Sequence, residues 1–264
     1  MGAADPRTHP TVASAPHPDP AGLLDEAGEA WREIRSLRET PPELVRTRLA
    51  LHAVAERVVS PARQRATGNE IALRWYPGGF GTPPFSDERG DRVIRVELTD
   101  LVDAFDGSER RAALTSLRAA GARVDDLVDP RELPDDALAI DPAAAAFLGD
   151  WFCFATLVIA DLRVGAPADL DPGWVQLWPE HFDVATDLGF KDAGARAAYG
   201  ASPGDAEHPD PYLYVAPWTA RPEGERWNAS AFAGAELSYA DLRRAGDPRA
   251  AADGFFAGCL AELA

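Results

Sequence analysis

Residues 143–160, AAAAFLGDWFCFATLVIA, form a nearly continuous apolar stretch that decides how the rest of the chain must fold. Roughly 18–20 apolar residues are also enough to span a membrane. Asp150, however, lies in the middle of the stretch, and acidic rather than basic residues flank it. A charge at the centre of a span costs about 2.5–3.5 kcal/mol. We therefore expect a buried helix of a soluble protein, with Asp141 as its N-cap and Pro142 in its first turn.

Two amphipathic helices are predicted before this stretch. Between residues 20 and 38, apolar residues recur at helical spacing, and charged residues fill the opposite side. Thr40 and Glu43 have the spacing of a capping box and start a second helix. This helix carries His52 at the border of its apolar stripe, and Pro61 is expected to end or kink it.

The segment that follows the second helix changes period. Residues 71–76 and 92–98 alternate between apolar and polar side chains, which predicts two antiparallel strands with a long structured connection. Residues 100–104 and 108–120 are expected to be helical.

The part of the chain after the apolar stretch is rich in β-type segments. We expect strands at 174–188, 195–202, 212–218 and 232–239, and then a final helix from residue 247. A short helix is the alternative for 178–188, because Pro179 follows Trp178 there.

These segments together predict an α+β fold, an antiparallel sheet meander with helices packed on one face. We expect a single domain over residues 21–264. Residues 1–20 contain five prolines and no apolar core, so they are interpreted as a disordered tail rather than a secretory signal.

The charge balance excludes several classes of partner. The chain has 43 acidic and 26 basic residues and a net charge of −17, which argues against nucleic-acid and anionic-membrane binding. Cys153 and Cys259 each lie in an apolar run, so we expect buried free thiols and a cytoplasmic protein. The sequence names no cofactor and leaves a homo-oligomer open.

The segment Trp-Pro-Glu-His-Phe-Asp at 178–183 is the main candidate for chemistry. In a strand, His181 and Asp183 would share one face and Glu180 would lie on the other. His181 could then act as a general acid or base that Asp183 orients. The alternative is a structural histidine hydrogen-bonded at the sheet surface. A metal site would require His52 to meet His181, and the sequence assigns no metal ligands.

Aromatic residues with polar tips are the second candidate group, because such side chains often line ligand pockets. At least half of them are expected to serve the sheet core instead. The candidate ligand-binding residues are His52, Glu180, Tyr199, Tyr212, Tyr214 and Trp218.

Three segments carry a resemblance to a bacterial family of unknown function that is common in actinobacteria. They are the Gly-Phe-Gly-Thr-Pro loop at 79–83 after His52, the Trp-Pro-x-His-Phe-Asp-x-Ala segment at 178–185, and Pro-Tyr-Leu-Tyr-Val at 211–215. The resemblance is spread over residues 50–262. It implies no activity, cofactor or catalytic residue, because the family has none assigned.

The sequence thus predicts a protein that binds a small molecule, or an enzyme, with its pocket near His181 and Asp183. The alternative is a non-enzymatic interaction protein whose aromatic residues and acidic surface serve a protein partner. The predicted pocket depends on one condition, that His181 and Asp183 open into the same cavity.

Overall fold

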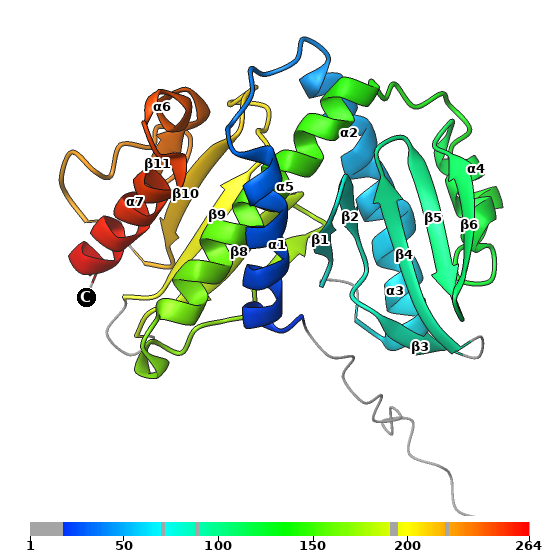
Figure 1. Cartoon of the computed structure of the whole chain (residues 1–264), viewed down its shortest axis with the longest axis horizontal. Coiled ribbons are helices and arrows are strands. Elements are labelled where there is room, and N and C mark those ends of the chain that lie inside the picture. The colour runs from blue at the N-terminus through cyan, green and yellow to red at the C-terminus, as the bar shows by residue number, and fades with distance from the viewer. Residues whose placement is uncertain (1–17, 70–71, 88–89, 191–194, 220–221, 264) are drawn as a thin grey trace, which may run out of the picture.

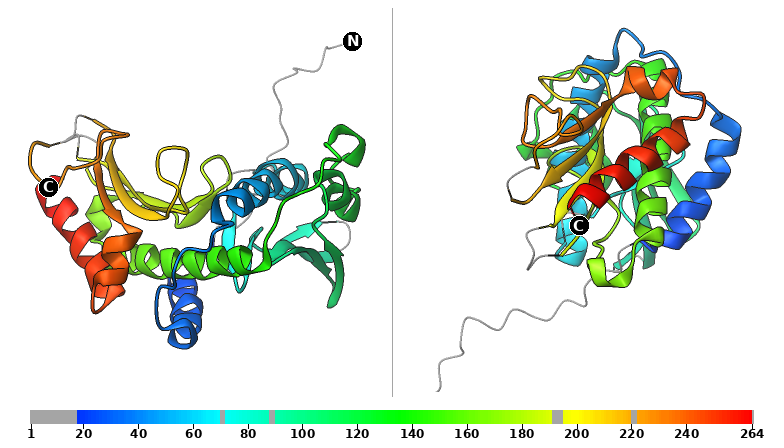
Figure 2. Two further views of the ribbon diagram at one scale, coloured as in Figure 1. Left: turned by 90° about the horizontal axis from the view of Figure 1, so that it is seen from above. Right: turned by 90° about the vertical axis from the view of Figure 1, so that its left-hand side faces the viewer.

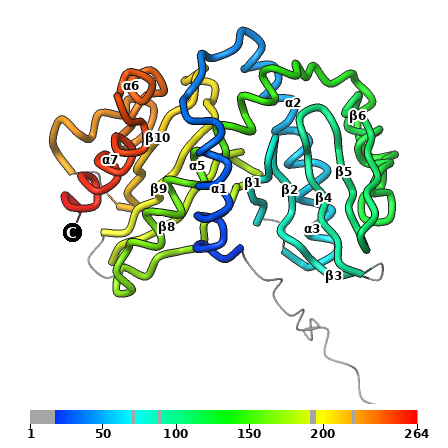
Figure 3. Tube along the Cα trace, viewed as in Figure 1, coloured from blue at the N-terminus to red at the C-terminus, as the bar shows by residue number. Residues whose placement is uncertain are grey.

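The computed structural model describes the chain except for residues 1–17, 70–71, 88–89, 191–194, 220–221 and 264. The expected tail over 1–20 therefore lies almost wholly outside the described residues. Figures 1 and 3 show an elongated molecule in which two sheets lie side by side and a long helix packs across one side of them.

The predicted apolar helix is α5 (Pro142–Gly165), which begins where the Asp141 side chain accepts a hydrogen bond from the Ala144 amide at 2.9 Å. An 18-residue window of α5 is apolar enough to cross a membrane, but 83% of that window is buried inside the structure. Helix α5 is therefore the core helix of a soluble fold, as the Asp150 argument predicts.

Antiparallel pairing organises the strands into two sheets. The first sheet has the order β1-β2-β4-β5-β6, and β3 pairs with β4. Its strands are β1 (Arg74–Tyr76), β2 (Gly79–Gly81), β3 (Phe85–Asp87), β4 (Gly90–Glu97), β5 (Asp100–Phe105) and β6 (Ser108–Ala113). The second sheet has the order β11-β10-β9-β8-β7. Its strands are β7 (Gln176–Trp178), β8 (Asp183–Leu188), β9 (Ala197–Ser202), β10 (Tyr212–Pro217) and β11 (Ala235–Ser238).

The fold class is confirmed as α+β, with the strands divided between two sheets instead of one. Leu73 and Leu177 form an isolated antiparallel bridge that joins the edges of the two sheets through hydrogen bonds of 3.1 and 2.9 Å. Helix α5 contacts β1 and β2 on one side of this joint and β8 and β9 on the other.

The remaining helices complete the layers (Figures 1 and 2). Helix α1 packs along α5, the helical run α2–α3 contacts both α5 and the first sheet, and α7 contacts β10 and β11. These helices are α1 (Pro20–Ile34), α2 (Leu44–Val54), a π-helical turn (Ala55–Val59), α3 (Ser60–Thr67), α4 (Leu117–Gly121), α6 (Tyr239–Arg244) and α7 (Pro248–Leu263). Short 3-10 turns lie at Ala122–Val124, Pro130–Glu132 and Ala168–Leu170.

Two sequence-based expectations are wrong. The segments at 100–104 and 108–120 were expected to be helical, but they form the hairpin β5–β6 and only the short helix α4. The turn of this hairpin is Asp106-Gly107, and both residues have positive φ, 52° and 75°. An Asp-Gly pair in this conformation matches the twist of a two-residue hairpin, which explains why strands form here.

The segment at 174–188, expected to be one strand, folds back on itself. Residues 179–182 form a turn between β7 and β8, and Trp178 pairs with Asp183 across it. Phe182 adopts a φ of 56°, an uncommon conformation for a non-glycine residue that lets the chain reverse there. His181 therefore lies in a turn, and Asp183 begins the next strand.

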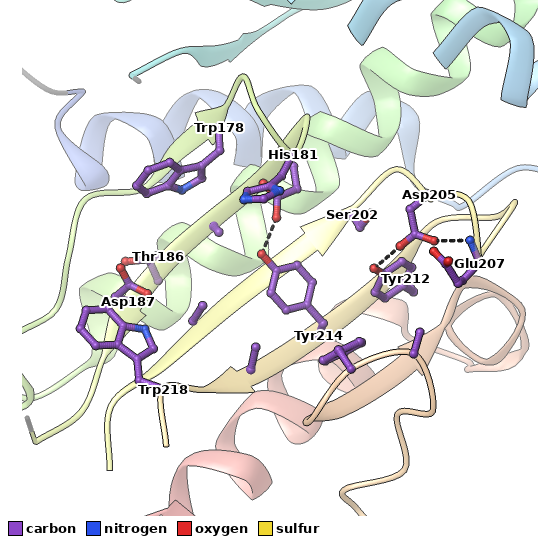
Figure 4. A pocket seen from close by; sticks show the side chains of 16 residues that line it. Trp178, His181, Thr186, Asp187, Ser202, Asp205, Glu207, Tyr212, Tyr214 and Trp218 are labelled. Atoms are coloured by element: carbon purple, nitrogen blue, oxygen red, sulfur yellow. Dashed lines mark hydrogen bonds between the residues drawn. The ribbon is translucent and has the colours of Figure 1, made fainter. Parts of the chain in front are cut away.

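The second sheet presents two different faces. Helices α5 and α7 lie on one face, where the buried residues of β8, β9 and β10 pack (Figure 2). The opposite face carries a pocket, which Figure 4 shows from close by.

Candidate functional site

The open face of the second sheet holds a pocket of about 570 Å³ (Figure 4). Strands β8, β9 and β10 supply its floor, the β7–β8 turn one wall, and the loops after β9 and before β11 the others. Its lining residues are Trp178, His181, Asp183, Ala185, Thr186, Asp187, Ala198, Ser202, Asp205, Glu207, Tyr212, Tyr214, Ala216, Trp218, Ala231 and Phe232.

Strand register explains why the floor is open. Across the sheet, Ala185 on β8 pairs with Gly200 on β9, which pairs with Tyr214 on β10. A Cβ atom at Gly200 would lie 2.2 Å from Cζ of Tyr214, so only glycine lets the tyrosine ring lie across β9. Ala198 and Ala216 pair beside this row, and small side chains therefore leave room above the strands.

Asp183 is the buried carboxyl group of the pocket. It is 4% exposed, and its Oδ2 accepts a hydrogen bond from the Tyr214 hydroxyl. Its Oδ1 has no hydrogen-bond partner among the described residues. Burial raises the pKa of Asp183 to about 6, against the opposing effects of the Tyr214 hydrogen bond and the nearby charge of His181. A carboxyl group near this value can exchange protons close to neutral pH.

His181 lines the same pocket but is exposed, because it lies in the β7–β8 turn. The structure thus brings His181 and Asp183 to one cavity without placing them on a common strand. The hydrogen bond of Asp183 goes to Tyr214, and His181 acts on the carboxyl group through its charge.

Asp205 is the contrasting carboxyl group at the other end of the pocket. Its oxygens accept hydrogen bonds from the Tyr212 hydroxyl at 2.6 Å and from the amides of Glu207 and His208 at 2.9 and 2.7 Å. Burial alone would raise the pKa of Asp205, but these hydrogen bonds lower it below its usual value. The two carboxyl groups therefore differ in their hydrogen bonds. Both oxygens of Asp205 accept hydrogen bonds from the protein, whereas Oδ1 of Asp183 accepts none among the described residues.

The predicted aromatic residues separate into two groups. Tyr212, Tyr214 and Trp218 line the pocket, as predicted. Trp218 is 59% exposed at the rim, where the Cζ atom of Arg196 lies 5.1 Å from its ring centroid. Tyr199 is fully buried on the helical side of β9, where its ring lies 6.1 Å from that of Phe256.

His52 and Glu180 do not line this pocket. The His52 Nε2 atom lies 2.9 Å from the carbonyl oxygen of Pro179, and its ring stacks on Phe182 at 5.2 Å. His52 therefore braces the β7–β8 turn through a backbone partner. Glu180 is exposed in that turn. Among the described residues, no three His, Cys, Asp or Glu side chains are grouped so that they could hold a metal ion.

Several residues that line the pocket were not identified as candidates from the sequence. Asp187 follows from the alternation of β8 once Asp183 is placed, and Trp178 was visible as one of the aromatic residues. Asp205 and Glu207 lie in a loop whose sequence carries no signal for a pocket. Arg48 on α2 holds this loop, because its guanidinium donates hydrogen bonds to the carbonyl oxygens of Pro203, Asp205 and Pro209 at 3.2, 2.8 and 2.9 Å.

Comparison with other proteins adds no assignment. The resemblance to the actinobacterial family of unknown function therefore stays a prediction. No family model, curated protein or solved structure matches this chain.

Proposed function

We propose that this protein binds a small organic molecule in the pocket of the second sheet and that Asp183 exchanges a proton with it. The observation that carries the proposal is the unpartnered Oδ1 of a carboxyl group that is 4% exposed and lines a pocket of about 570 Å³. Ligand pockets commonly have volumes of roughly 300–1,000 Å³ and few convergent polar groups.

Within this proposal the chemical roles differ from those of a histidine base. Asp183 is the general acid or base, because burial brings its pKa to about 6. Tyr214 holds the carboxyl group through its hydroxyl, and His181 contacts the ligand from the mouth of the pocket. An enzyme of this kind would protonate or deprotonate its substrate.

A thermal-shift screen with a metabolite library tests the proposal. Wild type, Asp183→Asn and Asp125→Asn are compared, since Asp125 is exposed and lies outside the pocket. We expect at least one compound to raise the melting temperature of wild type and Asp125→Asn, and to bind Asp183→Asn about tenfold or more weakly. Mass spectrometry of the incubated compounds then separates an enzyme from a binding protein.

A second outcome would overturn the proposal. If no compound stabilises the wild type, and size-exclusion chromatography shows an oligomer that grows with concentration, the interaction-protein alternative gains its support. A compound that binds Asp183→Asn as tightly as wild type would place the ligand elsewhere.

The proposed setting is the cytoplasm, with a small molecule rather than nucleic acid or a membrane as partner. Both cysteines are free and buried, which suits a reducing compartment. The net charge of −17 supports the exclusion of polyanionic partners. Cell fractionation of the native host tests the location.

A further inference from the structure

Carboxyl groups dominate the charges around the pocket. Four carboxyl groups line it, and no lysine or arginine is among its described lining residues. The only other ionisable side chains there are His181 and the two tyrosines Tyr212 and Tyr214. Arg196, the guanidinium behind Trp218, does not line the pocket, and its Nη1 donates hydrogen bonds to the carbonyl oxygen and side chain of Asp171. An anionic ligand would therefore meet repulsion from four carboxyl groups, which the single exposed imidazole of His181 at the mouth does not balance.

The apolar part of the lining consists of aromatic rings and alanine side chains. Trp178 and Trp218 lie at one end, with Asp187 beside them, and Tyr214 lies between this end and Asp205 (Figure 4). The Phe232 ring meets Tyr214 at 6.1 Å and 81°, an edge-to-face contact that fixes the tyrosine ring. Faces of aromatic rings attract cations, and the attraction grows where water is excluded.

Asp183 is the buried carboxyl group among the four, and it has an open position for a ligand. The Asp205 oxygens are already engaged by Tyr212, Glu207 and His208. Asp183 is almost completely buried and keeps one oxygen unpartnered among the described residues. A buried carboxylate of this kind is costly until a positive charge or a hydrogen-bond donor reaches it.

We propose that the ligand of this pocket is an organic cation, a protonated amine, whose charge lies against Asp183 and whose carbon skeleton contacts the aromatic rings. This inference rests on the proposed function and specifies the ligand class. A neutral sugar would stack on the same rings but leave the Asp183 charge uncompensated. A metal ion lacks a grouped set of three ligands among the described residues.

A matched pair of probes tests the charge requirement. Phenethylamine is compared with its neutral counterpart phenylethanol by isothermal calorimetry and tryptophan fluorescence at physiological salt. Glucose and benzoate form the neutral-sugar and anion arms. We expect phenethylamine to bind the wild type about tenfold or more tightly than phenylethanol.

Three variants locate the charge. Asp183→Asn should reduce the preference for the cation to about threefold or less, whereas Asp125→Asn should keep it. General attraction of cations by an acidic protein would survive both changes, so a loss in Asp183→Asn alone locates the charge at Asp183. Ala216→Leu adds bulk inside the pocket and should weaken every probe that binds there. Far-UV circular dichroism checks that each variant is folded.

The outcomes separate this inference from the proposed function. Equal or tighter binding of phenylethanol or glucose overturns the cation class and leaves the pocket as a binding site. Cation binding that Asp183→Asn does not weaken overturns the placement of the charge. If phenethylamine fails to bind while library compounds of another class bind, the inference alone is overturned, and failure of every compound overturns both.

Discussion

At the scale of single residues, Asp183 shows how a site can cost stability. Its carboxyl group is withdrawn from water, and the Tyr214 hydroxyl replaces only part of the lost solvation. Charged His181 favours the ionised form, whereas Glu180 in the same turn opposes it. Proteins keep such desolvated charged groups mainly at sites of catalysis or binding.

This burial predicts a specific dependence of stability on pH. The pKa of Asp183 is about 6 in the folded protein and 3.8 as the reference for the unfolded chain. Between these values the folded state binds more protons, so the free energy of unfolding falls as pH rises and the penalty is complete above pH 6. Its size is on the order of 2–3 kcal/mol, from the free energy of one pKa shift.

Urea denaturation from pH 5 to 7.5 checks this prediction. The range stays above the sequence pI of 4.6, because the solubility of a protein is lowest near its pI. We expect Asp183→Asn to become more stable relative to wild type as pH rises, and Asp125→Asn to show no such trend. A difference between wild type and Asp183→Asn that does not change with pH would mean that the carboxyl group is not desolvated.

At the scale of elements, helix α2 supports two of the walls of the pocket. Arg48 holds the loop that carries Asp205 and Glu207, and His52, one turn later, holds the β7–β8 turn that carries His181. A Cβ atom at Gly204 would lie 2.1 Å from Nη1 of Arg48, so the glycine lets the guanidinium reach the loop backbone. The pocket is therefore shaped by a helix that contributes no lining side chain.

Removing this support should loosen one wall selectively. In Arg48→Met the carbonyl oxygens of Pro203, Asp205 and Pro209 lose their donors, at a cost of about 1–3 kcal/mol. Hydrogen exchange of residues 204–208 should accelerate, and ligands found in the screen should bind severalfold more weakly.

The matched control is Arg46→Met on the same helix, because Arg46 is exposed and pairs only with Glu43 among the described residues. It should leave the exchange of residues 204–208 unchanged. Equal exchange in Arg48→Met and Arg46→Met would show that the loop holds itself in place.

Elements also show where sequence reasoning succeeds and fails. Helix α1 follows from helical spacing, and helix α5 follows from its apolar stretch and the cap Asp141, all of which are local signals. The hairpin β5–β6 was predictable from Asp106-Gly107, but the apolar spacing around it also fits a helix. The β7–β8 turn depends on the positive φ of Phe182, whose ring stacks on that of His52, a residue distant in sequence. No local sequence pattern predicts this turn.

The same limit applies to the site. Asp183, Tyr212 and Tyr214 lie on strands and Trp218 directly follows β10, so alternation identifies the face they share. Tyr199 follows the same rule but falls on the opposite face, which the sequence does not distinguish. Asp205 enters the pocket only because Arg48, more than 150 residues earlier, fixes its loop.

At the scale of the whole molecule, the two sheets share one core. Phe152 of α5 lies 6.3 Å from Phe80 of β2 and 5.1 Å from Phe182 of the β7–β8 turn, ring centre to ring centre. Phe80 and Phe182 also meet directly at 5.0 Å. Together with the bridge between Leu73 and Leu177, this cluster connects the first sheet to the wall of the pocket. If the chain forms the single domain expected from the sequence, both sheets should unfold cooperatively.

Two alanine variants test that cooperativity. Phe152→Ala should cost about 3–5 kcal/mol and lower the hydrogen-exchange protection of both sheets, because its ring contacts both. Phe256→Ala is the decisive variant, since its ring contacts Tyr199 of the second sheet, far from β4 and β5. If the molecule unfolds as one unit, Phe256→Ala lowers the protection of β4 and β5 as much as that of β9 and β10. If β4 and β5 keep their protection, the sheets unfold separately, and α5 joins two units that only share a surface.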